Sequence, residues 1–112
     1  MKKAIITAVF AATATFGMTA FAGQYIYTWG TITELKDHGD DLYVFGLDLS
    51  PNPAGCSTPS HARLQTSLSP TKKKGLRNVL HAAFIAGRQV KVKLHSTACN
   101  NTYPAIYGVL VK

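Results

Sequence analysis

From residue 25 onward, the chain alternates between apolar and polar positions with the period of two that is typical of β-strands. The clearest case is the segment in which Val90, Val92 and Leu94 alternate with polar side chains. Such a strand buries one face and leaves the other in water. The same pattern, rich in β-branched and aromatic residues, predicts five strands. They lie at Tyr25–Leu35, Leu42–Leu49, Ala62–Leu68, Val90–His95 and Ala105–Val111.

One segment has helical spacing instead. Leu76 and Leu80 repeat at an interval of four residues, with further apolar positions beside them. Ser69 suits the N-cap and Pro70 the first helical position, while Gly87 suits the C-terminal end. We therefore predict one helix between Ser69 and Gly87, placed between the third and fourth strands.

The order of the predicted elements is three strands, one helix and two strands. This is the order of the OB barrel, a five-stranded barrel of antiparallel type. Gly30 lies inside the first predicted strand, where a small closed barrel needs a bend. We therefore expect a mainly β fold, a small five-stranded OB-type barrel with one α-helix between strands 3 and 4. A small sandwich or an α+β roll is the alternative.

The start of the chain has the pattern of a bacterial secretory signal peptide. Two lysines precede an apolar run at residues 4–16, and alanines at positions 20 and 22 form a cleavage site after Ala22. The apolar run is too short to span a membrane. We expect residues 1–22 to be removed, which leaves one secreted or periplasmic domain, residues 23–112. That domain carries a net charge of about +5 and has no transmembrane segment.

Two cysteines, Cys56 and Cys99, are the only ones in the chain. In an exported protein they predict a single intramolecular disulfide, which would stabilise a domain this small by roughly 4 kcal/mol. An intermolecular disulfide is the alternative. A redox site would prefer Cys-x-x-Cys spacing, and zinc would need four ligands at close spacing. Neither pattern is present, so we expect no metal and no cofactor.

The region from Cys56 through Leu76–Gly87 to Gln89–Leu94 and Cys99 is similar to the subtilase-cytotoxin type of bacterial toxin B subunit. This resemblance implies an OB fold, a ring of subunits (a pentamer), recognition of cell-surface glycans and an exported toxin A chain as partner. The sugar-contacting residues of that family have no position-by-position match here, so none is carried over. The layout also resembles small periplasmic OB-fold proteins that have no toxin partner, although many of those lack a disulfide.

The charges are divided along the chain. All five acids lie between residues 34 and 48, and every charged residue from Leu49 onward is basic. This division suggests either a ring in which acidic hairpins meet basic neighbours, or a basic surface that holds an anion. The basic residues of the helix region would form a solvated face, line the pore of a ring, or hold an anion near the helix N-terminus. They are Lys72, Lys73, Lys74, Arg77, His81 and Arg88.

Aromatic side chains offer a second type of site, because sugars stack on aromatic faces beside a few polar groups. We select Trp29 and Tyr43 from the predicted strands, and Asn101 and Tyr103 from the predicted loop that follows Cys99. In an OB fold this loop borders the usual ligand face. Packing in the core or at a barrel end is the alternative role for these rings.

The sequence shows no Gly-x-Ser-x-Gly elbow, and His38 with its neighbouring aspartates is the only acid–base cluster. We therefore expect a non-enzymatic, oligomeric module that binds cell-surface glycans. The alternative is a monomeric periplasmic OB-fold protein that binds a small anionic or envelope ligand. Single-stranded nucleic acid is a weaker alternative, because export separates the protein from it.

Overall fold

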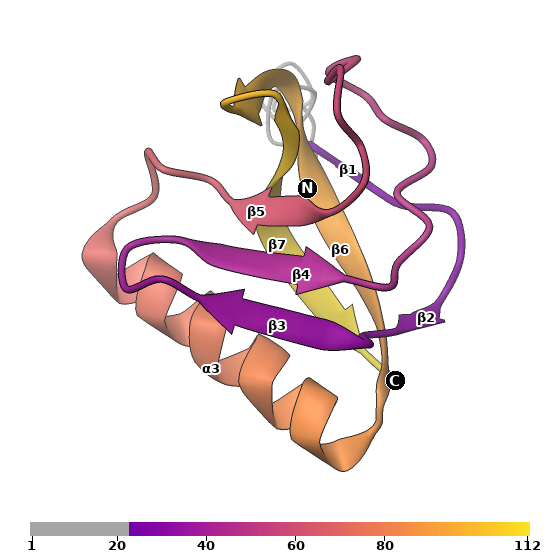
Figure 1. The fold of residues 1–112 in the computed structure, drawn as a ribbon, viewed down its shortest axis with the longest axis vertical. Coiled ribbons are helices and arrows are strands. Elements are labelled where there is room, and N and C mark those ends of the chain that lie inside the picture. Colours follow the sequence, from indigo (N-terminus) through magenta and orange to yellow (C-terminus); the bar gives the residue numbers. More distant parts are fainter. Residues whose placement is uncertain (1–22) are drawn as a thin grey trace, which may run out of the picture.

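The computed structural model describes residues 23–112, and the expected signal peptide, residues 1–22, lies outside the described residues. In chain order, three short strands are followed by two more strands, one helix and two long strands (Figure 1). The elements are β1 (Gln24–Tyr25), β2 (Gly30–Thr31), β3 (Glu34–Asp37), β4 (Leu42–Phe45), β5 (Ala62–Leu64), α3 (Pro70–Ala86), β6 (Gln89–Asn100) and β7 (Tyr103–Val111).

All the strands belong to one sheet. Its order is β1-β6-β7-β5-β4-β3, and β2 pairs with β6 beside this path. Every pair is antiparallel except β5 with β7, which is parallel. The helix α3 contacts both β3 and β7. Within residues 23–112 the predicted mainly β fold with one helix is therefore confirmed, and the helix lies between β5 and β6.

The first predicted strand is three short strands instead of one. β1 and β2 pair with β6, whereas β3 pairs with β4, so the chain changes partner between Thr31 and Glu34. Gly30 lies just before this change, and a Cβ there would come within 2.9 Å of the Leu47 side chain. The expected count of five strands is wrong, because the sheet has seven. Among residues 23–112 the strand order ends at β1 and β3, and it is not closed into a barrel.

Two further predicted strands are shorter than expected. β4 ends at Phe45 because Gly46 turns the backbone with a φ of 102°, a conformation that L side chains rarely adopt. A Cβ at Gly46 would lie 2.7 Å from the backbone nitrogen of Thr33, so the two segments touch here. β5 ends at Leu64 rather than Leu68.

β6 and β7 form a long antiparallel pair joined by a tight turn. β6 continues past His95 to Asn100, because its pairing with β7 resumes at Cys99 and Pro104 after an irregularity. Tyr103, which we expected in a loop, therefore lies in β7. Only residues 101–102 turn, and Asn101 has a φ of 61°.

The helix begins and ends where the sequence predicts. The Ser69 side chain accepts a hydrogen bond of 3.2 Å from the backbone of Lys72, and Pro70 opens the first turn. Gly87 adopts the left-handed conformation with a φ of 66° and donates its N–H back to the last turn. On its inner side, α3 buries Leu80 and Ala83 against the sheet.

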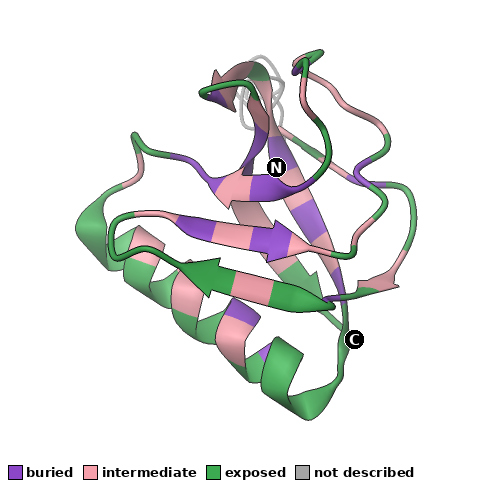
Figure 2. Cartoon of the chain, viewed as in Figure 1, coloured by how far each residue is buried: buried purple, intermediate pink, exposed green. Residues whose placement is uncertain are grey.

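The core lies between the inner face of the sheet and α3. Alternate residues of β4, β5 and the first half of β6 point inward and are buried, as Figure 2 shows by the banding along β4 and β5. Their neighbours point outward and form the outer surface of the sheet. In β7 the buried residues are consecutive, from Pro104 to Ile106. The largest fully buried side chains include Ile26, Leu42, Leu64, Leu80, Leu94 and Ile106.

The predicted disulfide is confirmed. Cys56 and Cys99 are joined across 43 residues of sequence, with their Cα atoms 5.8 Å apart. The bond fastens the loop between β4 and β5 to the end of β6. The Asn52 side chain supports the same loop through two hydrogen bonds to the backbone of Cys56.

Replacement of both cysteines by alanine is expected to lower the free energy of unfolding by roughly 4 kcal/mol, because the unfolded chain regains the entropy of an open loop. Urea unfolding followed by circular dichroism measures the change. Wild-type protein treated with reductant should lose the same amount. Equal stability of the reduced and oxidised proteins would contradict the structural role of this bond.

Candidate functional site

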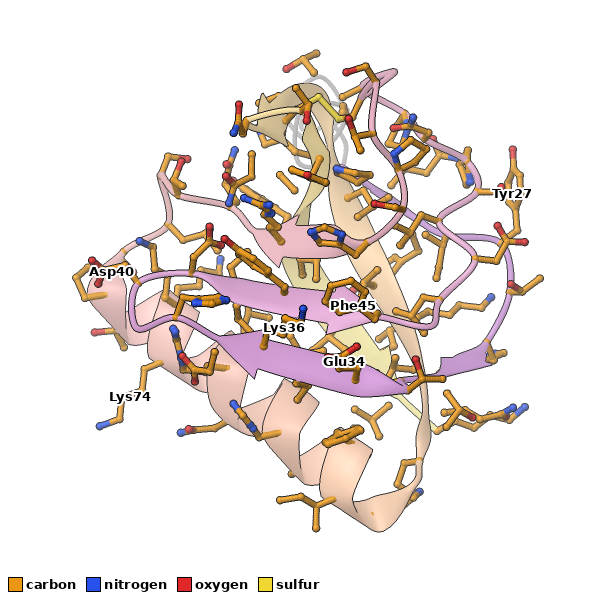
Figure 3. The ribbon with its side chains drawn as sticks, in the orientation of Figure 1. Tyr27, Glu34, Lys36, Asp40, Phe45 and Lys74 are labelled. Carbon is orange, nitrogen blue, oxygen red and sulfur yellow. A yellow bond between two sulfur atoms is a disulfide. The ribbon has the colours of Figure 1, made fainter. Side chains whose placement is uncertain are left out.

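Five side chains form a continuous patch on the outer surface of the sheet, which we call the aromatic face: Tyr43, Phe45, His61, Arg63 and Tyr103. β4 buries Leu42 and Val44, so the residues that alternate with them point outward. The same alternation turns Arg63 outward between the buried residues of β5. Figure 3 shows Phe45 on β4 beside Lys36 of the neighbouring β3.

The imidazole of His61 lies between two aromatic rings. Its centroid is 4.4 Å from that of Phe45 and 4.3 Å from that of Tyr103, and both pairs are stacked. Tyr43 lies at 5.4 Å in a tilted arrangement. His61 is buried, whereas the three surrounding rings are half-buried. The rings therefore hold one another in fixed positions and still reach solvent.

Arg63 joins the two tyrosines of the aromatic face. Its guanidinium carbon is 3.9 Å from the ring centroid of Tyr43 and 3.8 Å from that of Tyr103, which is the geometry of a cation–π contact. Tyr43 and Arg63 are direct partners in the pairing of β4 with β5. Asp41 lies 3.9 Å from the guanidinium and balances part of its charge.

The hydrogen bonds of His61 define its tautomer. Arg63 Nε donates to His61 Nε2 at 3.2 Å, and a guanidinium can only donate, so Nε2 carries no proton. The neutral ring therefore holds its proton on Nδ1, which faces the Ser60 hydroxyl at 3.2 Å. Burial lowers the pKa of His61 below its ordinary value, and the positive charges of Arg63 and Lys36 lower it further.

The loop before β5 and the turn after β6 bring His61 and Tyr103 together. The disulfide fastens this loop to β6, and Thr58 donates its backbone N–H to the carbonyl of Thr102 at 2.9 Å. The buried Asn100 side chain donates to the carbonyl of Leu64 at 2.6 Å and to Asp41 at 3.2 Å. Residues distant in sequence are thereby fixed at one edge of the aromatic face.

The acidic hairpin and the basic helix, separate along the chain, meet in the structure. Both nitrogens of the Arg77 fork donate to the Asp37 carboxylate, at 3.1 and 2.8 Å, and Arg77 also donates to the carbonyl of Gly39. His81 Nε2 lies 3.2 Å from the same carboxylate. These contacts, led by the Arg77 hydrogen bonds, lower the pKa of Asp37 from 3.8 to about 2. Within one chain, then, hairpin and helix neutralise part of each other's charge.

The six basic residues predicted for the helix region do not share one environment. Arg77 and His81 pair with the hairpin, while Lys73 and Lys74 line an open hollow of about 320 Å³ with Gly39, Asp40, Pro70 and Arg77. Lys72 points to the ring of Tyr107, at 5.8 Å. Beyond the helix, Arg88 donates to the carbonyl of Lys112 at 2.7 Å.

Of the predicted ligand residues, Tyr43 and Tyr103 come together around Arg63. Asn101 is exposed in the turn next to Tyr103. Trp29 lies elsewhere, with Lys91 and Lys112 each 5.3 Å from its ring. Sequence reasoning missed Phe45, His61 and Arg63 as site residues. Phe45 shares its strand face with Tyr43, and this parity is the signal that could have identified it.

Comparisons of the chain with protein-family models, with curated proteins and with solved structures gave no match. Among residues 23–112, no helix combines the length and the hydropathy that crossing a membrane requires. Within the same range, His, Cys, Asp and Glu side chains form no group of three or more that could hold a metal ion.

Asp37→Asn is expected to lower the free energy of unfolding at pH 7 by up to about 1 kcal/mol, because solvent screens this partly exposed pair. Because the pKa of Asp37 is lowered in the folded state, the contribution of its carboxylate to the free energy of unfolding is complete above pH 3.8. This contribution is lost as the pH falls to about 2. Urea unfolding across this range should show the two proteins converging. Asp40→Asn, in the same hairpin, is the control with little effect. A stability difference that is constant with pH would contradict the ion pair.

Proposed function

We propose that the protein is a non-enzymatic carbohydrate-binding module and that the aromatic face is its ligand site. The observation that carries the proposal is the set of half-buried rings fixed around Arg63 and His61 on an outer sheet surface. Sugars bind to aromatic rings through their C–H faces, and a few polar groups fix their orientation. Arg63 supplies such a donor group between two tyrosines.

The proposed fold is an OB-type barrel. If β1, β2 and β3 are treated as one interrupted strand, it pairs with β6 at one end and with β4 at the other. The parallel pairing of β5 with β7, and the helix between β5 and β6, support the same assignment. On this assignment β4 and β5 are strands two and three, the usual ligand face of OB folds. The aromatic face lies on these strands.

We further propose that the module is exported and acts as an oligomer of the toxin B-subunit type, with a toxin A chain as its partner. The disulfide supports export, since such bonds persist in oxidising compartments. An apolar hollow of about 260 Å³ supports subunit association. It is lined by Val79, Ala82, Ala83 and Ala86 of the helix with Arg88 and Val111.

The alternative is a monomeric periplasmic protein that binds a small anion. The hollow that Lys73, Lys74 and Arg77 line favours this reading. Light scattering on protein eluting from a size-exclusion column separates the two proposals. A strict monomer at micromolar concentration would contradict the oligomer, and binding of a small anion that weakens steeply with salt would support the alternative.

A glycan array followed by calorimetry tests the carbohydrate site. Tyr103→Ala and Arg63→Gln are each expected to weaken binding of the selected glycan by at least about tenfold, because they remove a ring and a donor at the centre of the face. Tyr27→Ala is the matched control. Tyr27 is 66% exposed and points away from the aromatic face (Figure 3), so its loss should change affinity by less than about twofold.

Circular dichroism and thermal unfolding must show that the variants are folded. Absence of binding to every glycan on the array would contradict the proposed function. Equal affinities of folded Tyr103→Ala and Tyr27→Ala would contradict the assignment of the site to the aromatic face.

A further inference from the structure

A second outer surface, formed by β1, β6 and β7 together with the first turn of α3 and the residue before β2, carries four lysines among three aromatic rings. We call it the lysine stripe: Lys72, Lys91, Lys93, Lys112, Tyr25, Trp29 and Tyr107. Lys91 and Lys93 point outward from β6 because Val90, Val92 and Leu94 point into the core. This surface is distinct from the aromatic face, which lies on β4, β5 and the start of β7.

Each lysine of the stripe lies over an aromatic ring. Lys91 and Lys112 are both 5.3 Å from the ring of Trp29. Lys93 is 5.6 Å from Tyr25 and 5.9 Å from Tyr107, and Lys72 is 5.8 Å from Tyr107. Cation–π contacts of this kind favour particular positions for flexible lysine side chains. The ammonium groups are therefore partly ordered before any ligand arrives.

Two backbone features shape the stripe. Gly108 faces Lys93 across the β6–β7 pair, and a Cβ there would lie 3.4 Å from Lys93 Cε and 3.7 Å from the Tyr25 hydroxyl. The Lys93 side chain and the Tyr25 hydroxyl therefore lie close to the backbone of β7 at Gly108. At the other end, Lys112 is held by its N–H bond to Gln89 and by the Arg88 hydrogen bond to its carbonyl.

The positive charge of the stripe has no carboxylate partner among the described residues. The ion pairs within residues 23–112 use other cations: Lys36, Arg63, Arg77 and His81. All five acids of the chain lie between residues 34 and 48. Lys91 and Lys93 also stand about 7 Å apart on one strand face, where like charges repel each other. An external polyanion would relieve this repulsion.

We propose that the lysine stripe binds an extended anionic polysaccharide, whose repeated sulfate or carboxylate groups contact the lysines while its sugar rings lie on Tyr25, Trp29 and Tyr107. A polysaccharide is favoured over nucleic acid because the disulfide fits an oxidising compartment. This inference goes beyond the proposed function, since it assigns a different surface and a ligand held mainly by charge.

Trp29 is the only tryptophan of the chain, so its fluorescence reports directly on the stripe. We would titrate the protein with heparin, as a sulfated polysaccharide, at several salt concentrations. The wild type should show a change in Trp29 emission and an affinity that falls steeply with salt. The double variant Lys91→Gln/Lys93→Gln should bind at least about tenfold more weakly, with a salt slope smaller by about two.

The matched control is Lys73→Gln/Lys74→Gln, which removes the same charge from the hollow beside the hairpin, outside the stripe. Its affinity for heparin should stay within about threefold of the wild type. Weakening confined to this control would assign heparin to that hollow and overturn the proposal. Equal weakening of the two double variants would overturn the proposal, because net charge alone would then explain binding. Heparin binding without a change in Trp29 emission would also overturn it.

A single-stranded oligonucleotide of equal charge provides the last comparison. Tighter binding of the oligonucleotide than of heparin at the stripe would overturn the choice of polysaccharide. Glycan binding at the aromatic face should be unchanged in Lys91→Gln/Lys93→Gln, so failure of one proposal is distinguishable from failure of the other.

Discussion

The candidate site depends on the contacts that the Arg63 guanidinium makes. One planar cation contacts a tyrosine from β4, a tyrosine from the start of β7 and the imidazole that precedes β5. Asp41 balances part of its charge, and Asn100 ties that carboxylate to the backbone of β5. Loss of the guanidinium would leave Asp41 without its ionic partner and His61 Nε2 without its donor. The face is therefore one coupled unit.

Local signals in the sequence are sufficient to predict several features of the structure. The helix was predictable because Ser69, Pro70 and Gly87 each act within a turn of the helix end that they define. The disulfide was predictable because two cysteines allow only one internal pairing. The outward direction of Tyr43 and of Lys93 follows from strand alternation, which needs no tertiary information.

Features that depend on contacts between distant segments were not predictable. The first predicted strand is divided because its two ends pair with different strands, β6 and β4. The alternation of apolar and polar residues is the same with either partner, so it could not reveal the division. We expected Tyr103 in a loop because its neighbours Asn101, Thr102 and Pro104 are typical of loops, whereas in the structure it pairs with Asn100. Asp37 pairs with Arg77 although 40 residues separate them, so the separation of acids from bases along the chain is partly lost in the folded structure.

The proposed roles of the two outer surfaces differ in how charge is balanced. On the aromatic face, Arg63 already has a carboxylate partner and its rings are packed together, which suits a ligand recognised by shape and hydrogen bonds. On the lysine stripe, the cations have only aromatic partners, which suits a ligand that brings its own negative charge. The same sheet thus offers two chemically different surfaces, one on β4 and β5 and the other on β1 and β6.

The most direct test of the coupled face is a nitrogen-15 NMR titration of the His61 ring. The account predicts a neutral ring protonated on Nδ1, a pKa below the ordinary 6.5, and a higher pKa in Arg63→Gln. A ring protonated on Nε2, with a pKa at or above 6.5 that Arg63→Gln leaves unchanged, would contradict it.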